Sequence, residues 1–239
     1  MIVLHEPRVI FLKARKVGGT SFEIGLSRFA TRSSIITPIT KEDEDTRRAL
    51  GFRGPQNYKY NLWELSWREA TQALRARERP NKFYNHISAR NAKHLLGTNI
   101  WEKYTKVSIV RNPFDYVVSS FFWSAAGRRA SNVALEFEPW VISRPNLLNV
   151  NDDQYKIDGK NIIDFMIRYD NLDHDLRSLE IAVPQLLGFS DLFKMIRAKG
   201  KYRPKSATME AMFSSAPHAY DLVKKAYAEE IEEYGFALP

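Results

Sequence analysis

Six consecutive residues near the start of the chain, Lys16 to Ser21, have the side chains and the backbone freedom to hold a phosphate or a sulfate. Gly18 and Gly19 carry no Cβ, so the backbone can turn sharply there and approach a ligand closely. Thr20 and Ser21 stand at an expected helix start, where unpaired N–H groups and the helix dipole favour an anion. An ordinary strand-to-helix turn with a solvated lysine is the alternative interpretation.

The order of residues in this turn differs from that of the loop that holds ATP and Mg²⁺. That loop follows the pattern G-x-x-x-x-G-K-[ST], in which the lysine comes after the glycines. Here Lys16 precedes Gly18 by two residues. The turn therefore suits a phosphate or sulfate, and it does not predict an ATP–Mg²⁺ site.

A second candidate for anion binding lies at Arg111 and Ser119. An apolar run ends at Arg111, Asn112-Pro113 is typical of a helix start, and Ser119 lies about two turns into that helix. Arginine can grip a phosphate through two parallel hydrogen bonds, and a serine hydroxyl can complete the grip. Either residue alone is more often a surface charge or a neutral helix position, so the prediction depends on the pair.

A hydroxyl acceptor would need a base, and histidine is the usual one near neutral pH. The chain has five histidines, namely His5, His86, His94, His174 and His218. We rank His86 first because it ends an expected short strand just before a capped helix. A buried strand histidine bonded to the backbone is the alternative, and Glu23 and Asp115 rank below it as bases.

The elements that must position these residues alternate between strands and helices. Apolar and β-branched runs predict strands over 8–14, 33–39, 82–87, 106–111 and 162–169. Helical spacing and caps predict helices over 20–30, 64–79, 88–96, 113–126, 170–182 and 217–234. We expect a surface excursion over 41–60, a long irregular loop over 127–160 and a mobile end around His5. This alternation indicates an α/β fold with a mostly parallel sheet, whose ligands bind beyond the carboxyl ends of the strands.

Length and composition limit the classes of protein. The 239 residues predict a single domain over 1–239, and the net charge of +8 favours anionic partners such as nucleotides, nucleic acid, anionic glycans or membrane surfaces. There is no cysteine, which fits a reducing cytoplasm and excludes disulfides and thiolate metal sites. No apolar run approaches the roughly 20 residues of a membrane span, and the first residues do not resemble a signal peptide.

Four segments, in chain order, resemble the PAPS-dependent sulfotransferases, specifically the carbohydrate-type, Golgi-like branch in a bacterial member. The first two are Lys16-Val17-Gly18-Gly19-Thr20-Ser21 and Arg111-Asn112-Pro113-Phe114-Asp115-Tyr116-Val117-Val118-Ser119. The other two are Ile167-Arg168-Tyr169-Asp170-Asn171-Leu172 and the stretch from Tyr227 to Phe236. The resemblance spans nearly the whole chain and is weakest over 40–80.

The resemblance implies a three-layer, P-loop-NTPase-like sulfotransferase fold and an enzyme that transfers a sulfuryl group from PAPS to a hydroxyl of a carbohydrate. It implies catalytic roles for Lys16 and His86, and no metal. The residues it implies for the donor are Lys16, Val17, Gly18, Gly19, Thr20, Ser21, Arg111, Ser119, Lys201 and Arg203. It further implies a cytoplasmic bacterial enzyme without nucleic-acid partners, a trimmed lumenal domain being the alternative.

The chain departs from this family at two positions and leaves other functions open. Arg15 stands where the family has proline, and Glu230 replaces the closing aspartate. A nucleotide-dependent phosphoryl transferase is one alternative function. A non-catalytic module that binds polyanions is another, supported by the net charge and by the basic residues Arg68, Arg75, Arg77 and Arg79.

Overall fold

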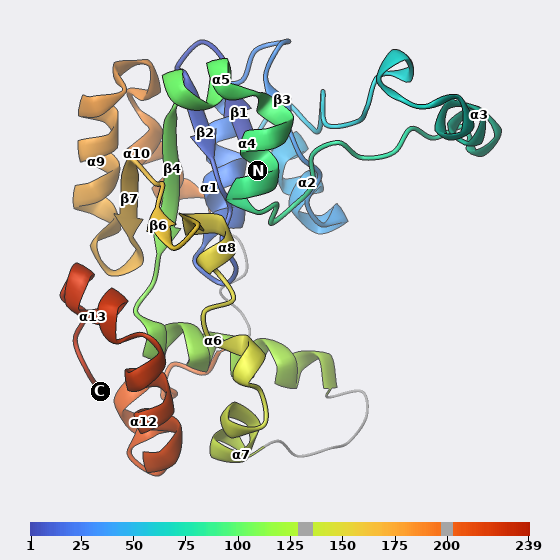
Figure 1. The fold of residues 1–239 in the computed structure, drawn as a ribbon. Coiled ribbons are helices and arrows are strands. Elements are labelled where there is room, and N and C mark those ends of the chain that lie inside the picture. The colour runs from blue at the N-terminus through green and yellow to red at the C-terminus, as the bar shows by residue number, and fades with distance from the viewer. Residues whose placement is uncertain (129–135, 197–202) are drawn as a thin grey trace.

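Five strands form a mixed sheet in the order β3-β1-β2-β4-β7 (Figure 1). The strands are β1 (Ile2–Leu4), β2 (Val9–Phe11), β3 (Ile35–Ile36), β4 (Thr105–Val110) and β7 (Phe165–Arg168). The computed structural model describes residues 1–128, 136–196 and 203–239. Helices cover the sheet, so the α/β class predicted from the sequence is confirmed.

The sheet is mixed, and the prediction of a mostly parallel sheet is wrong. Strand β1 lies antiparallel to both β2 and β3, whereas β4 lies parallel to β2 and β7. The chain returns from Leu4 to Val9 through a tight turn in which Arg8 has a φ of 55°. So short a connection can only reverse the chain, because parallel neighbours need a long crossover. The segment around His5, expected to be a mobile end, is therefore the turn of the hairpin that joins β1 to the central strand β2.

Alternate side chains of the strands enter two different hydrophobic clusters, one on each face of the sheet. Val9 and Phe11 face one cluster, and Ile10 and Leu12 face the other. The first cluster is closed by α1 (Gly19–Leu26), α9 (Leu172–Ala182) and α10 (Phe189–Met195). The second is closed by α4 (Ala89–Leu96) and α5 (Thr98–Lys103). The sheet is thus buried on both faces.

A third cluster, rich in aromatic rings, lies beyond the carboxyl end of β4. It is formed by α6 (Pro113–Arg128), α7 (Phe137–Ile142), α11 (Met209–Phe213) and α12 (Pro217–Ala226) (Figure 1). Helix α6 begins at Asn112-Pro113, as the sequence predicts, and the Asn112 side chain accepts the N–H of Phe114 at 3.0 Å. This cluster holds α6 rigidly below the sheet, so that one face of α6 turns toward the strand ends.

Shorter elements complete the fold. Helix α8 (Asp152–Tyr155) precedes the small hairpin of β5 (Lys156–Ile157) and β6 (Lys160–Asn161), and α13 (Ala228–Tyr234) ends the chain. Single turns of 3-10 helix cover 27–29, 62–64, 145–147, 169–171 and 184–186. Helices α2 (Lys41–Ala49) and α3 (Trp67–Ala76) precede α4.

Four predicted segments differ from the structure. The irregular loop expected over 127–160 contains α7, α8 and β5 among its described residues. The expected excursion over 41–60 begins with α2, whose acidic first turn and basic last turn suit the helix dipole. Residues 82–87 form a loop instead of a strand, because the N–H groups of Lys82 and Phe83 both donate to the carbonyl of Tyr58, at 2.8 and 2.9 Å. The expected helix over 217–234 is broken into α12 and α13 at Tyr227.

Candidate functional site

A cavity of about 550 Å³ opens beyond the carboxyl ends of the four strands that run in one direction, β2, β3, β4 and β7. Each of these strands supplies wall residues from the segment that follows it. The segment after β2 supplies Lys16 and the residues from Gly18 to Ser21. Thr40 follows β3, Arg111 follows β4 and Tyr169 follows β7. The two anion motifs, far apart in sequence, thus share one cavity.

The glycine turn is fixed by what lies against it. Gly18 has a φ of 79°, and a Cβ there would lie 2.9 Å from Cε2 of Tyr169. A Cβ on Gly19 would lie 2.8 Å from Cγ of Lys13. Both positions therefore leave no room for a side chain. Of the six residues, Val17 alone does not line the cavity, because it is buried in the core below it.

Arg15 uses a backbone group that a proline at its position would lack. Its backbone N–H donates to Oδ1 of Asn151 at 2.8 Å, and its carbonyl accepts Nδ2 of the same side chain at 3.1 Å. Proline has no N–H and could make only the second bond. Arg15 therefore ties the turn to the segment before α8, a contact for which no pattern in the sequence is a signal.

Arg111 is held from three sides. Its Nη1 donates to the carbonyl of Lys16 at 2.8 Å and its Nε donates to Asp115 at 2.5 Å. Its guanidinium carbon also lies 4.4 Å from the ring centroid of Tyr169. Since Tyr169 also packs against Gly18, one aromatic ring supports both anion motifs. The sequence placed Tyr169 in a family segment but assigned it no role.

One face of α6 lines the cavity with residues at helical spacing, namely Tyr116, Ser119, Ser120, Trp123 and Ser124. Ser119 therefore lines the same cavity as Arg111. Trp123 is a residue that sequence reasoning missed, although it stands one turn after Ser119 on this face. The ammonium of Lys16 lies 4.3 Å from the centroid of one of its rings. This contact gives the Lys16 side chain a defined place at the cavity.

His86 lines the cavity from the loop before α4. Its Nδ1 lies 3.0 Å from the carbonyl of Lys13. A carbonyl only accepts, so we assign the proton to Nδ1, which leaves Nε2 with its lone pair. Burial, with smaller contributions from the charges of Lys13 and Arg15, lowers the pKa of His86 to about 4. The imidazole is therefore neutral near pH 7.

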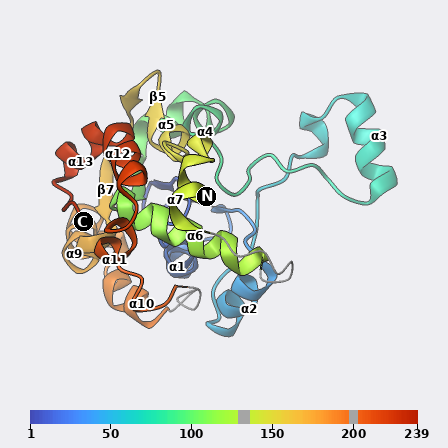
Figure 2. The ribbon, with the colours of Figure 1, turned by 90° about the horizontal axis from the view of Figure 1, so that it is seen from below.

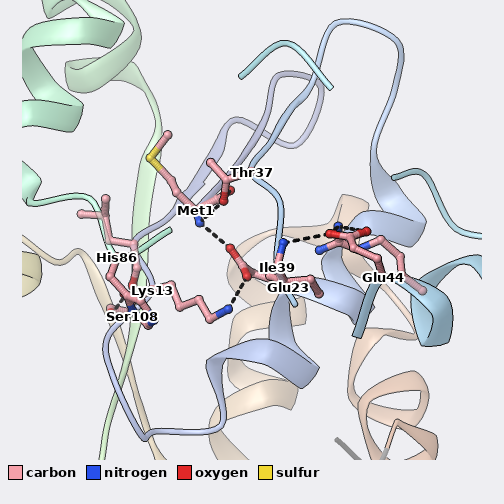
Figure 3. Close-up of polar contacts among 10 residues, drawn as sticks. Met1, Lys13, Glu23, Thr37, Ile39, Glu44, His86 and Ser108 are labelled. Carbon is pink, nitrogen blue, oxygen red and sulfur yellow. Dashed lines mark hydrogen bonds and ion pairs between the residues drawn. The ribbon is translucent and has the colours of Figure 1, made fainter. Parts of the chain in front are cut away.

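Lys13 and Glu23 form a buried ion pair beneath the turn (Figure 3). Nζ of Lys13 lies 2.7 Å from Glu23, whose other carboxylate oxygen accepts the amino group of Met1. Although burial would raise it, these two positive charges lower the pKa of Glu23 to about 2. Glu23, the lower-ranked base, does not line the cavity and is committed to holding Lys13.

Backbone strain occurs at both residues expected to do chemistry, Lys16 and His86. Lys16 has a φ of 60° and His86 a φ of 58°, both in the left-handed region that non-glycine residues rarely adopt. Such conformations cluster at functional sites because the surroundings must hold them. Asn85, beside His86 on the cavity wall, has a buried Oδ1 without a hydrogen-bond partner in the described part of the chain. A donor group on a ligand would satisfy it.

The remaining predicted residues lie outside the cavity wall or outside the described residues. Arg203 contacts the carboxylate of Asp115 and donates from Nε to the carbonyl of Ala207 at 2.6 Å. It therefore balances the charge of Asp115, the other lower-ranked base, beside Arg111. Lys201 lies outside the described residues. His5, His94, His174 and His218 do not line the cavity.

A small pocket behind the turn contains a buried carboxyl group. It is lined by Val17, Arg111, Asp152, Tyr227 and Glu230, among others. Burial, followed by repulsion from Asp152, raises the pKa of Glu230 to about 7. Glu230 thus belongs to the structure behind the cavity rather than to its wall.

No protein-family model matches the chain, and neither curated proteins nor solved structures give a significant match to it. Among residues 1–128, 136–196 and 203–239, no three His, Cys, Asp or Glu side chains are grouped so that they could hold a metal ion. In the same ranges, no helix combines the length and the apolar character needed to cross a membrane.

Proposed function

We propose that this chain is a PAPS-dependent sulfotransferase that moves a sulfuryl group to a hydroxyl of a carbohydrate acceptor. The observation behind the proposal is that Lys16, the residues from Gly18 to Ser21, Arg111, Ser119 and His86 all line one cavity. Its volume of about 550 Å³ falls in the range of small-molecule sites, roughly 300–1,000 Å³. The sulfotransferase arrangement of the P-loop-like sheet is part of the same proposal.

The described residues fit both anionic ends of such a donor. The N–H groups at the start of α1 suit the 5′-phosphosulfate, because Gly18 and Gly19 carry no side chain that would keep a ligand from the backbone. Arg111 and Ser119 suit the 3′-phosphate, and Arg203 offsets the carboxylate of Asp115 next to them. The Oδ1 atom of Asn85 can accept a hydrogen bond from PAPS or from the hydroxyl of the carbohydrate.

PAPS, when bound, supplies a sulfuryl group on a good leaving group, so no metal is needed to activate it. Nε2 of His86 accepts the proton of the acceptor hydroxyl as its oxygen forms the new bond to sulfur. The ammonium of Lys16 neutralises the charge on the bridging oxygen as the old sulfur–oxygen bond breaks. The bond from His86 Nδ1 to Lys13 keeps the imidazole in the tautomer that can accept this proton.

The test is calorimetric titration with PAP, the desulfonated donor, on the wild type and on Arg111→Ala. We expect binding to the wild type and a loss of about 10-fold or more in the variant, the usual worth of a charge-assisted contact. Arg48→Ala, an exposed arginine on α2, is the matched control and should bind as the wild type does. Labelled PAPS then screens carbohydrate acceptors.

Failure of the folded wild type to bind PAP would refute the proposal. Binding of ATP with Mg²⁺ in place of PAP would favour the phosphoryl transferase. Binding of anionic polymers with steep salt dependence, without PAP, would favour the polyanion module.

A further inference from the structure

The stretch from Tyr58 to Phe83 leaves the body and returns to it, and it carries α3 at its far end; we call it the arm. We propose that the tip of the arm is a docking surface for an anionic lipid bilayer, which holds the protein at a membrane without a spanning helix. This inference is independent of the proposed function, because no arm residue lines the cavity.

Tyr58 and Phe83 root the arm in a hydrophobic cluster of the body, whereas the part between them has no such support. Figures 1 and 2 show α3 standing away from the rest of the molecule in two views at right angles. None of residues 61–79 belongs to the three hydrophobic clusters. The two strands of chain that form the stalk are joined by a bridge between Lys59 and Asn81 and by a 3.0 Å bond from Tyr60 to Pro80. The tip therefore meets only solvent.

The tip exposes large apolar side chains on one side. Trp67 and Leu74, seven residues apart and on one face of α3, are 83% and 65% exposed. Trp63, on the turn before α3, is 83% exposed as well. Exposed tryptophans are costly in water, and at a bilayer their amphipathic rings settle at the headgroup level. The exposed side chains of the tip need a partner that covers them, and the composition of the tip matches a bilayer.

The charge of the arm fits an anionic surface. Six basic and three acidic side chains lie between Tyr58 and Phe83. Each acid is already used within the arm: Glu78 pairs with Lys59, Glu64 pairs with Lys82, and Glu69 caps Ser66. The four arginines, none of which pairs with an acid in the described part of the chain, are Arg68, Arg75, Arg77 and Arg79. Arg68 and Arg75, seven residues apart, lie along one edge of the Trp67 face, where they can reach lipid phosphates.

The same charges argue against a second copy of this chain as the partner. Two copies would bring net charges of +8 together, with positively charged arms in contact. The acidic run on α2 gives little compensating surface: Glu42 is exposed, but Glu44 pairs with Arg47, Asp45 pairs with Arg48, and Asp43 is buried. A bilayer with anionic lipids has the opposite charge and an apolar interior for the tryptophans.

The helix at the tip is prepared for this contact. Ser66 and Glu69 form a capping box that satisfies the first N–H groups of α3. A ten-residue helix is marginal alone in water, so a surface that buries its apolar face would also stabilise it. Because the arm projects from the body, α3 stands apart from the rest of the molecule, as a contact with a flat surface requires (Figures 1 and 2).

The experiment is co-sedimentation with vesicles of phosphatidylcholine, with and without phosphatidylserine. We expect binding to the mixed vesicles and little to phosphatidylcholine alone. Trp63→Ser with Trp67→Ser should weaken binding at least 10-fold, since it removes both rings. Arg68→Gln with Arg75→Gln should weaken it several-fold per charge and flatten its salt dependence. All four residues are exposed, so thermal melting monitored by circular dichroism should be unchanged.

The matched control is Ile181→Ser with Arg177→Gln on α9, where an apolar and a basic residue are also exposed. It should bind as the wild type does. Equal vesicle binding by the tryptophan variant and the wild type would overturn the proposal. A wild-type dimer in light scattering that becomes a monomer in the tryptophan variant, with no vesicle binding, would overturn it in favour of a second copy.

Discussion

Arg111 donates a 2.8 Å hydrogen bond to the carbonyl of Lys16, so the side chain of the second anion motif is anchored on the backbone of the first. The two residues are 95 positions apart in the sequence and follow neighbouring parallel strands. A disturbance of either motif therefore changes the other. Variants at one motif should be read for their effect on both.

The ring of Tyr169 should matter for anion binding although it carries no charge that would attract an anion. Tyr169→Ala removes the face on which Arg111 lies and the wall against Gly18. We expect PAP to bind about 5-fold more weakly, the usual worth of a partly buried cation–π contact. Tyr169→Phe keeps the ring and should retain affinity. Similar losses in both variants would mean that the hydroxyl, and not the ring, is responsible.

His86 should act as a base over an unusually wide range of pH. A histidine with the ordinary pKa near 6.5 is half protonated at pH 6.5, whereas His86, with a pKa of about 4, is still neutral there. Sulfuryl transfer should therefore stay level from pH 8 to about 5 and fall as the pH approaches 4. His86→Asn should lose transfer but keep PAP binding. His94→Asn, one helix turn into α4, is the control and should keep both.

The lowered pKa of His86 also makes the stability of the protein depend on pH. The unfolded chain binds a proton at His86 below about pH 6.5, while the folded chain resists it down to about pH 4. Unfolding is thus favoured as the pH falls through this window. The His86→Asn variant should lose less stability than the wild type between these two values in urea titrations.

The glycines of the turn should tolerate alanine worse than a free glycine with the same backbone. Gly18→Ala suffers both a φ of 79° and a contact with Tyr169, and we expect a loss of about 1–3 kcal/mol in the free energy of unfolding. Gly188 has nearly the same backbone, with a φ of 87° and a ψ of 1°, and nothing within 4 Å of its Cβ position, so Gly188→Ala isolates the backbone cost. Equal losses in urea unfolding would show that the contact with Tyr169 is unimportant.

Glu230 should destabilise the protein at alkaline pH. Its pKa is raised to about 7, so the folded chain holds a proton that the unfolded chain loses near pH 4.5. Stability therefore falls as the pH rises from about 4.5 to 7. Glu230→Gln should be more stable than the wild type at pH 8, by at most about 3 kcal/mol, and equal to it near pH 4.5. A constant difference across this range would contradict the assignment.

Local signals in the sequence predicted the parts of the fold that depend on them. The glycine turn, the Asn112-Pro113 helix start and the Ser88 cap of α4 each have a short-range cause, and the structure has all three elements. The rule of carboxyl strand ends also pointed to the edge of the sheet where the cavity lies. The chemical roles of the cavity residues remain predictions.

The rest depended on contacts that a single sequence does not display. The short run Ile2–Leu4 looked like a loose end, and its place between β2 and β3 is decided by tertiary pairing. The bonds to Tyr58 that turn residues 82–87 into a loop also come from another part of the chain. Asn151 and Trp123 reach the site for the same reason. None of these contacts leaves a periodic pattern.

The left-handed backbone at Lys16 and His86 sets two kinds of evolutionary pressure against each other. Glycine or asparagine would relax both positions, so selection for thermal stability alone would enrich these residues there. Under the proposed function, selection for turnover would remove them, because the proposed sulfuryl transfer uses the ammonium and the imidazole. The residues that a selected library of variants carries at these two positions would therefore show whether it evolved for stability or for catalysis.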